Sequence, residues 1–290
     1  MVIWYNHQTK FEKRNMQRYT TFKTSLLSRI FGTFANKKFN LALQIFINKT
    51  YTKLMKVDLS DFEEASHYPT LNKLFTRSLK NTRTFEDNSA SFISPCDSFI
   101  SACGDIKDNL ALQIKGFSYD VRGLLGDFIA KKNKDKLDGG SFVNFYLSPK
   151  DYHRYHVPID MRVSKAIHIP GKLYPVNFKW LKKIHGLFVE NERVILECYT
   201  TDEKLFYMVF VGALNVGKMC FTFDENIQTN AKGNLQQCYM YNDIVLSKGS
   251  ELGHFEMGST IVMLFEKESI KLQAKEISSI RFGMNLGIRI

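Results

Sequence analysis

Residues 248–265 have the sequence KGSELGHFEMGSTIVMLF, in which three glycines precede an uninterrupted apolar run from Ile261 to Phe265. Glycines spaced in this way are typical of a tight turn, and an apolar run of this length is typical of a buried strand. Ser259, which joins the two parts, also carries a hydroxyl that could act as a nucleophile. The segment alone leaves both interpretations open.

Other runs rich in β-branched and aromatic residues precede this segment, separated by clusters of Gly, Asn, Asp and Lys. We expect strands at 141–147, 193–200, 205–211, 219–223, 238–246 and 260–265. The stretch from 58 to about 83 is polar and helix-like, and 131–140 resembles an exposed loop. The predicted fold class is α+β, with amino-terminal amphipathic helices followed by a largely antiparallel β catalytic domain.

The net charge of +11 is concentrated near the amino terminus, where eleven basic residues up to Lys56 accompany one acid, Glu12. Apolar residues recur there at helical spacing, and the pattern predicts two basic amphipathic helices within 25–55. Such helices could contact an anionic membrane or pack on the protein's own core. We therefore expect two regions, a basic helical one at 1–57 and a catalytic domain at 58–290.

The composition, 44% hydrophobic and 24% charged, is that of a globular chain and argues against disorder. Five cysteines, none in a C-x-x-C pair, favour reduced thiols over a disulfide framework or a zinc knuckle. No apolar stretch reaches the roughly 18 residues of a transmembrane helix, and the start of the chain lacks an apolar signal segment. These features predict an intracellular protein.

Three places carry residues suited to catalysis. Asp97 follows Pro95 in a predicted turn, His153 and His156 lie three residues apart, and Ser259 precedes the last long apolar run. Asp97, His156 and Ser259 supply an acid, a base and a nucleophile, although a turn aspartate or surface histidines would also explain the first two places. No third ligand with suitable spacing accompanies the histidine pair, so no metal is expected.

Several motifs, in one order, resemble those of the bacterial-type, pyruvoyl-dependent phosphatidylserine decarboxylases, over about 47–267. They are Asn72-Lys73-Leu74-Phe75-Thr76-Arg77-Ser78-Leu79-Lys80, then Leu147-Ser148-Pro149-Lys150-Asp151-Tyr152-His153-Arg154-Tyr155-His156-Val157-Pro158, Gly171-Lys172-Leu173-Tyr174-Pro175-Val176-Asn177, Asn191-Glu192-Arg193, Val211-Gly212-Ala213-Leu214-Asn215-Val216-Gly217, and the segment 248–260. Ser98 and Met257 stand where the family commonly has glycine and leucine. The resemblance therefore covers most of the chain and ends on the family's processing site.

The resemblance implies that Asp97, His156 and Ser259 carry out self-cleavage and that the Gly258-Ser259 bond breaks. It implies that Ser259 becomes a covalent pyruvoyl group, with no metal, and that His153 takes part in decarboxylation as a candidate proton donor. Asn177 is a candidate substrate-binding residue.

The implied chemistry explains these residue types. His156 takes the Ser259 proton, Oγ attacks the Gly258 carbonyl, and β-elimination of the resulting ester leads to the pyruvoyl group with loss of ammonia. That group forms a Schiff base with the amine of phosphatidylserine and accepts the electrons left when CO2 departs, so that phosphatidylethanolamine is produced.

The implied partners are phosphatidylserine in an anionic membrane, the chain's own α and β fragments, and a second copy in a homo-oligomer. A peripheral place on the cytoplasmic face of a membrane follows, without a transmembrane helix. Alternatives are a pyruvoyl decarboxylase of a soluble amino acid and an inactive membrane-binding relative. A nucleic-acid binder is disfavoured, because the basic segment is rich in Leu, Ile and Phe and carries no nucleic-acid motif.

Overall fold

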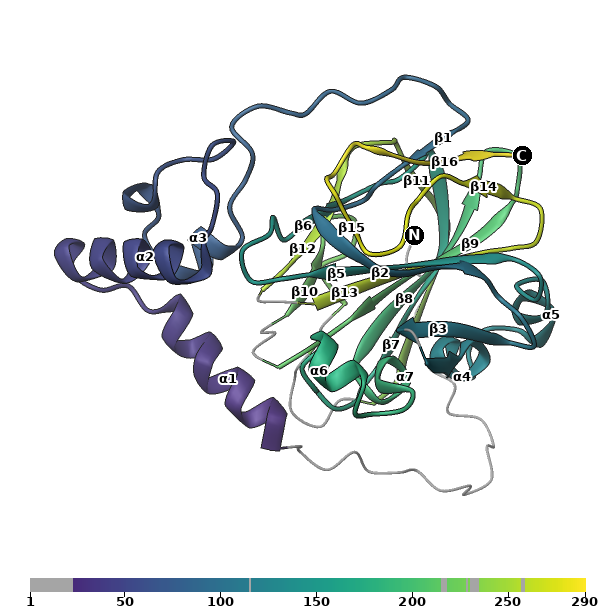
Figure 1. The fold of residues 1–290 in the computed structure, drawn as a ribbon, viewed down its shortest axis with the longest axis horizontal. Helices are drawn as coiled ribbons and strands as arrows, with labels where there is room; N and C mark the ends of the chain where they lie inside the picture. The colour runs from purple at the N-terminus through teal and green to yellow at the C-terminus, as the bar shows by residue number, and fades with distance from the viewer. Residues whose placement is uncertain (1–22, 115, 215–217, 228, 230–234, 257–258) are drawn as a thin grey trace.

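A large antiparallel sheet lies at the centre of the molecule (Figure 1). In the computed structural model, which describes residues 23–290 except 115, 215–217, 228, 230–234 and 257–258, this sheet has eight strands. Their order is β11 (Gln237–Leu246), β7 (Met161–Ile169), β8 (Arg193–Thr200), β9 (Leu205–Val211), β13 (Ser259–Phe265), β5 (Ser141–Leu147), β2 (Ser98–Asp105) and β15 (Ser278–Ile280). All neighbouring strands are antiparallel.

The predicted α+β class is confirmed, and each of the predicted strands is present. β5, β8 and β9 have the expected bounds, while β11 and β13 each begin one residue earlier than expected. β10 (Met219–Phe221) ends two residues before the predicted limit. All five cysteines are free, as predicted.

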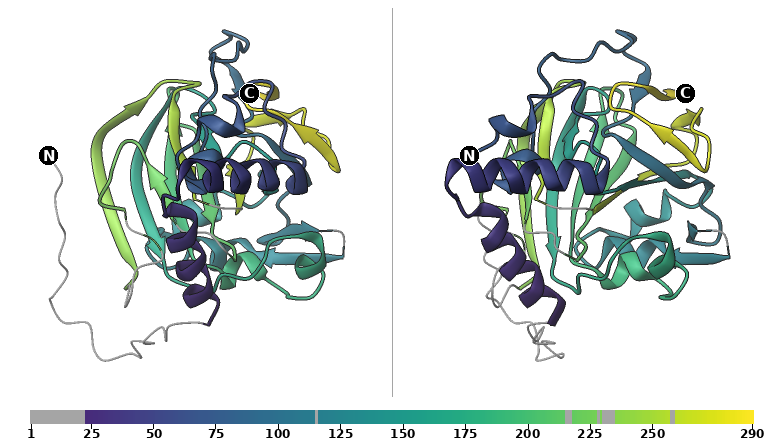
Figure 2. Two further views of the ribbon diagram at one scale, coloured as in Figure 1. Left: turned by 90° about the vertical axis from the view of Figure 1, so that its left-hand side faces the viewer. Right: turned by 60° about the vertical axis from the view of Figure 1, so that its left-hand side comes forward.

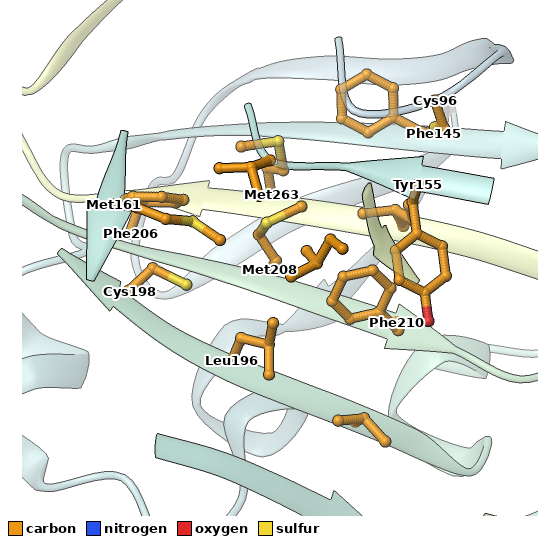
Figure 3. Packing of buried hydrophobic residues seen from close by; sticks show 14 of the residues in the cluster. Cys96, Phe145, Tyr155, Met161, Leu196, Cys198, Phe206, Met208, Phe210 and Met263 are labelled. Carbon is orange, nitrogen blue, oxygen red and sulfur yellow. The ribbon is translucent and has the colours of Figure 1, made fainter. Parts of the chain in front are cut away.

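The central strands are buried on both faces of the sheet. Along β13, Ile261, Met263 and Phe265 join one apolar cluster, whereas Val262 and Leu264 join another on the opposite face. Figure 3 shows Met263 in the first cluster, close to Met208 and Phe206 of β9. A strand covered on both sides needs apolar residues at every position, which explains the uninterrupted run in the sequence.

Smaller sheets cover the first of these clusters. One has the order β1 (Ser91–Ile93), β16 (Asn285–Arg289) and β14 (Ile270–Leu272), and the other has the order β10, β12 (Glu251–Phe255) and β6 (Arg154–His156). The second cluster is covered by α4 (Val121–Leu125), α6 (Phe178–Leu181), α7 (Leu187–Glu190) and the hairpin of β3 (Leu110–Ile114) and β4 (Phe117–Asp120), seen below the large sheet in Figure 1.

Two helices, α1 (Lys23–Asn36) and α2 (Leu41–Met55), confirm the predicted helical pair. Asn40 caps α2 by accepting a hydrogen bond from the Leu43 amide. Both helices lie at one side of the β layers (Figure 2) and pack on α3 (Leu71–Phe75), and α2 also packs on η1 (Ala65–His67). Within the described part of the chain, none of the helices has the length and apolarity to cross a bilayer.

Two local predictions were wrong. Between 58 and 83 only η1 and α3 are helical, because the chain after Thr76 turns so that the buried Arg77 guanidinium can donate to the Lys150 and Asp151 carbonyls at 2.8 and 3.1 Å. The expected loop near 131–136 contains a short helix, α5 (Lys131–Asp135), whose Asn133 is buried and donates to the Glu197 carboxylate at 3.1 Å.

Candidate active site

Ser259 is the first residue of β13 and pairs with Leu147 of β5. It is completely buried, and its Oγ has no hydrogen-bond partner among the described residues. A buried hydroxyl without a partner is costly, so such a group is a candidate for a chemical role. The neighbouring Gly258, the predicted other side of the cleaved bond, lies outside the described residues.

His156, at the end of β6, is buried, and both of its ring nitrogens are engaged. Nδ1 lies 3.0 Å from the Gly249 carbonyl oxygen, which can only accept, so Nδ1 carries the proton. Nε2 therefore has the lone pair and accepts from the Tyr152 hydroxyl at 3.0 Å. Burial lowers the pKa of His156 to about 4, which leaves the ring neutral and available as a base near neutral pH.

Asp97 lies beside His156 without bonding to it. The Phe282 amide donates to Asp97 Oδ1 at 2.8 Å, and the Phe282 ring stacks on His156 with centroids 3.6 Å apart. The Asp97 carboxylate also takes two hydrogen bonds from the Arg83 guanidinium, at 2.5 and 3.0 Å. Among the described residues no hydrogen bond joins Asp97, His156 and Ser259 to one another, and the Gly249 carbonyl occupies the orienting place at Nδ1.

The strand register nevertheless brings Asp97 near Ser259. Phe99 of β2 pairs with Tyr146 of β5, so the preceding residue, Ser98, lies opposite Leu147 of β5. On the other side of β5, Leu147 pairs with Ser259 of β13. Adjacent strands are about 4.8 Å apart, so the backbones at 98 and 259 are separated by about 10 Å. Asp97 and Ser259, the predicted acid and nucleophile, thus lie toward the same end of the β2, β5 and β13 strands, and the predicted base His156 lies beside Asp97.

His153 is fully buried, and its ring packs on Phe75 with centroids 4.0 Å apart. Nδ1 donates to the Asp151 carbonyl at 2.8 Å, while the buried Nε2 has no partner in the part of the chain that the structure describes. Burial, aided by the Arg77 charge, lowers the pKa of His153 to about 3. The His153 carbonyl accepts from the Phe255 amide at 3.0 Å, which ties this histidine to the strand that leads toward Ser259.

Asn177 caps α6: its side chain accepts a hydrogen bond from the Trp180 amide at 3.3 Å. This local role is explained by the preference of helix starts for Asn. Neither His153 nor His156 belongs to a group of three metal-ligating side chains within the described segments.

A cavity of about 560 Å3 adjoins these residues. Its lining includes Asp97, Ser98 and Tyr152 together with the cationic Lys56 and Lys150. Asp58, Asp61 and Asp151 line it as well, so the wall carries both cationic and anionic side chains.

Sequence reasoning missed four residues of this arrangement, Arg83, Tyr152, Gly249 and Phe282. Gly249 has φ of +78°, and a Cβ there would lie 2.2 Å from the Phe85 ring, so only glycine fits the position that orients His156. Tyr152 and Gly249 belong to two of the family motifs, 147–158 and 248–260. Arg83 and Phe282 carry no such sequence signal.

Comparison with known proteins identifies the relatives of this chain. A profile of the phosphatidylserine decarboxylase family matches residues 71–288. The chain belongs to this family. It is 47% identical over 266 residues to a phosphatidylserine decarboxylase proenzyme of Helicobacter pylori, covering 91% of this chain and 97% of that protein. It is 45% identical to the phosphatidylserine decarboxylase proenzyme of Campylobacter jejuni, over 88% of this chain and 96% of that protein. It is 34% identical to that of Coxiella burnetii, over 90% of this chain and 93% of that protein.

Phosphatidylserine decarboxylases are carboxy-lyases, so the chain is an enzyme of this class. The resemblance in the sequence motifs is thereby confirmed.

The buried neutral histidines predict a loss of stability in acid. His153 and His156 have a pKa of about 3 and about 4 in the folded chain, below the ordinary value of roughly 6.5. Between these values the unfolded chain binds more protons, so the free energy of unfolding should fall as pH decreases from about 6.5 to 4, by up to about 1.4 kcal/mol per pH unit for each histidine.

Urea denaturation of a Ser259→Ala chain at pH 7 and pH 5 measures this change, and His153→Gln should reduce the slope. An unfolding free energy that is independent of pH over this range would contradict the burial of neutral rings.

Proposed function

We propose that this chain cuts itself between Gly258 and Ser259 and then converts phosphatidylserine into phosphatidylethanolamine and CO2. The observation that carries the proposal is the buried, unpartnered Oγ of Ser259 at the start of β13, with Asp97 toward the same end of the strands and His156 beside Asp97. The names of the Helicobacter and Campylobacter relatives, which are decarboxylase proenzymes, support it.

His156 is suited to be the base of the cleavage step. Its Nε2 lone pair now accepts from Tyr152, so this hydroxyl must release Nε2 before the ring can take the Ser259 proton. The neutral ring gains a positive charge at that moment, and the nearby Asp97 carboxylate stabilises it. Arg83 holds that carboxylate in place, so it acts as a positioning residue.

The new group would be held by the sheet. A pyruvoyl group at position 259 supplies an electron sink for decarboxylation. Residues 259–290 contain β13 between β9 and β5, β15 beside β2, and β16 beside β1, so the small fragment stays bound to the large one after the cut. Ser259 is buried at the start of this fragment, which excludes water from the reacting end.

His153 is suited to proton transfer in the second reaction. Its Nδ1 proton is fixed by the Asp151 carbonyl, so the unpartnered Nε2 can hold or accept a proton at one defined position. We assign it a proton-transfer role: neutral Nε2 accepts a proton from the substrate ammonium group as the Schiff base forms, and returns it to the α-carbon once CO2 has left.

The cavity next to Asp97 supports an anionic lipid headgroup as substrate. Its volume of about 560 Å3 suits a small polar group, and Lys56 and Lys150 provide charge for a phosphate. A substrate-binding role for Asn177 stays a prediction, because its side chain already caps α6.

Residues 1–57 are proposed as the membrane-contacting region and 58–290 as the catalytic domain. On α2, Leu43, Phe46 and Leu54 differ by 3, 8 and 11 positions, so they share one face, and they are 41%, 65% and 71% exposed. Lysines 37, 38, 49, 53 and 56 are exposed around them. Such a surface suits the interface of an anionic membrane, which supports a peripheral place on its cytoplasmic face. Association into a homo-oligomer stays a prediction.

Ser259→Ala should give a full-length chain with no decarboxylase activity, because neither the nucleophile nor the new group can form. Intact mass spectrometry under denaturing conditions should show two fragments for the unaltered chain and one for the variant. The matched control is Ser250→Ala in the same segment, whose hydroxyl donates only to the Ser247 carbonyl. Cleavage of the Ser259→Ala chain at this bond would overturn the assignment.

His153→Gln should separate the two reactions. Self-cleavage should proceed, since His156 is its base, while turnover should fall by about 10²–10⁴-fold, the usual loss when a proton-transfer group is removed. Fragment formation is followed by mass and turnover by CO2 release. Equal losses in both reactions, or full turnover, would contradict the division of labour between the histidines.

Phe46→Glu combined with Leu54→Glu should weaken binding to vesicles containing phosphatidylserine by about tenfold or more, since each apolar side chain contributes about 1.5–3 kcal/mol on burial. Self-cleavage should not change. Val245→Glu on β11, which is 72% exposed, is the control and should bind normally. Vesicle sedimentation measures the bound fraction, and unaltered binding of the double variant would refute the membrane contact.

A further inference from the structure

Three metal-ligating side chains lie on one face of the small sheet formed by β10, β12 and β6. Cys220 pairs directly with His254, and the Glu256 amide continues the ladder by donating to the Lys218 carbonyl at 2.8 Å. Alternate strand residues share a face, so Cys220, His254 and Glu256 point together. The intervening Met219 and Phe255 are buried in the core on the other side.

The three donor atoms, a thiol sulfur, an imidazole nitrogen and a carboxylate oxygen, lie within 4.8 Å of one another. All three side chains are half-buried. Within the described ranges, no hydrogen bond or ion pair engages any of these three side chains. Donors that face one another without partners are a second sign, beside their chemistry, that they receive a ligand.

We propose that Cys220, His254 and Glu256 form a binding site for a borderline divalent transition-metal ion of the zinc type. Thiolate, imidazole and carboxylate are the donors that Zn2+ prefers, with bonds of about 2.0–2.3 Å. Donor atoms of a tetrahedral site with such bonds lie about 3.5 Å apart, so closure by roughly 1 Å through side-chain rotation suffices. Binding through Cys220 transfers the thiol proton to solvent.

The surroundings leave the fourth position accessible. Cys220 and His254 line a cavity of about 540 Å3 that also reaches Asp224. Three protein ligands with one open position resemble sites that hold water or a further ligand on the metal.

Two cations on the same face set the strength of the site. Arg154 pairs with His254 in the strand register, but Glu251 accepts from its guanidinium at 2.6 and 2.8 Å and balances its charge. Lys218 has no such ion pair among the described residues, and its charge acts on Cys220. Removal of the Lys218 charge should therefore strengthen the binding of a cation.

The site is independent of the proposed cleavage. All three ligands precede position 258, so they stay on the large fragment whether or not the chain is cut. Binding can therefore be tested without an activity assay.

The test is titration of the full chain, unaltered and as Ser259→Ala, with ZnCl2 against a chromogenic chelator and separately with Co2+. We expect one ion per chain and, with Co2+, the near-ultraviolet charge-transfer band of a thiolate ligand. Cys220→Ser, His254→Gln and Glu256→Gln should each weaken binding by about tenfold or more, as loss of an outer ligand partner already costs 10–100-fold. Lys218→Gln should bind more tightly.

The matched control is Cys103→Ser, since Cys103 is also a half-buried thiol but lies on β2, where its Sγ contacts the Ala274 carbonyl. It should bind as the unaltered chain does. Glu256→Gln preserves the size of the side chain, so the test still holds if one of the other variants misfolds. Circular dichroism checks the folding of each variant. Absence of saturable binding, absence of the thiolate band, or equal affinity in Glu256→Gln and the unaltered chain would overturn the proposal.

Discussion

The burial of β13 on both of its faces is the constraint on which the rest of the structure depends. This strand lies between β9 and β5, and its seven residues pair with one or both neighbours. Its side chains divide between two apolar clusters, each covered by a separate layer of strands or helices. Because the strand is central, its first residue, Ser259, is held at a fixed place relative to Leu147 and through it to the start of β2.

The same arrangement explains how a chain could break next to β13 and remain one molecule. The residues that follow position 259 contribute strands to the large sheet and to the sheet of β1, β16 and β14. Their hydrogen bonds and apolar contacts join them to segments throughout the chain. The peptide bond before Ser259 therefore contributes little to holding the last 32 residues, 259–290, on the rest of the chain. The central position in the sheet thus keeps Ser259 buried and would hold together the two fragments of the proposed cleavage.

The electrostatics around His156 depend on one nearby residue, Tyr152, and on partners from distant segments of the chain. Gly249 fixes the ring proton, Tyr152 engages the lone pair, Phe282 covers the ring, and Arg83 holds the neighbouring Asp97. In this arrangement His156 is neutral and its lone pair is engaged by a hydroxyl, so the proposed removal of the Ser259 proton would require a local exchange of hydrogen-bond partners. The face of β10 and β12 turned away from the core provides a separate set of donors, in which Cys220, His254 and Glu256 are juxtaposed.

The sequence by itself determined the α+β class, the paired amino-terminal helices and the bounds of β5, β8 and β9, because strands buried on both faces and amphipathic helices leave direct periodic signals. It also determined the motifs around His156 and Ser259, through their resemblance to a family. Only the tertiary structure decided that 58–83 is mostly non-helical and that 131–135 forms α5, since buried contacts of Arg77 and Asn133 outweigh local propensity there. It alone decided that Arg83 and Phe282 meet Asp97 and that Gly249 orients His156, because contacts between residues far apart in the chain depend on strand register, which local sequence does not encode.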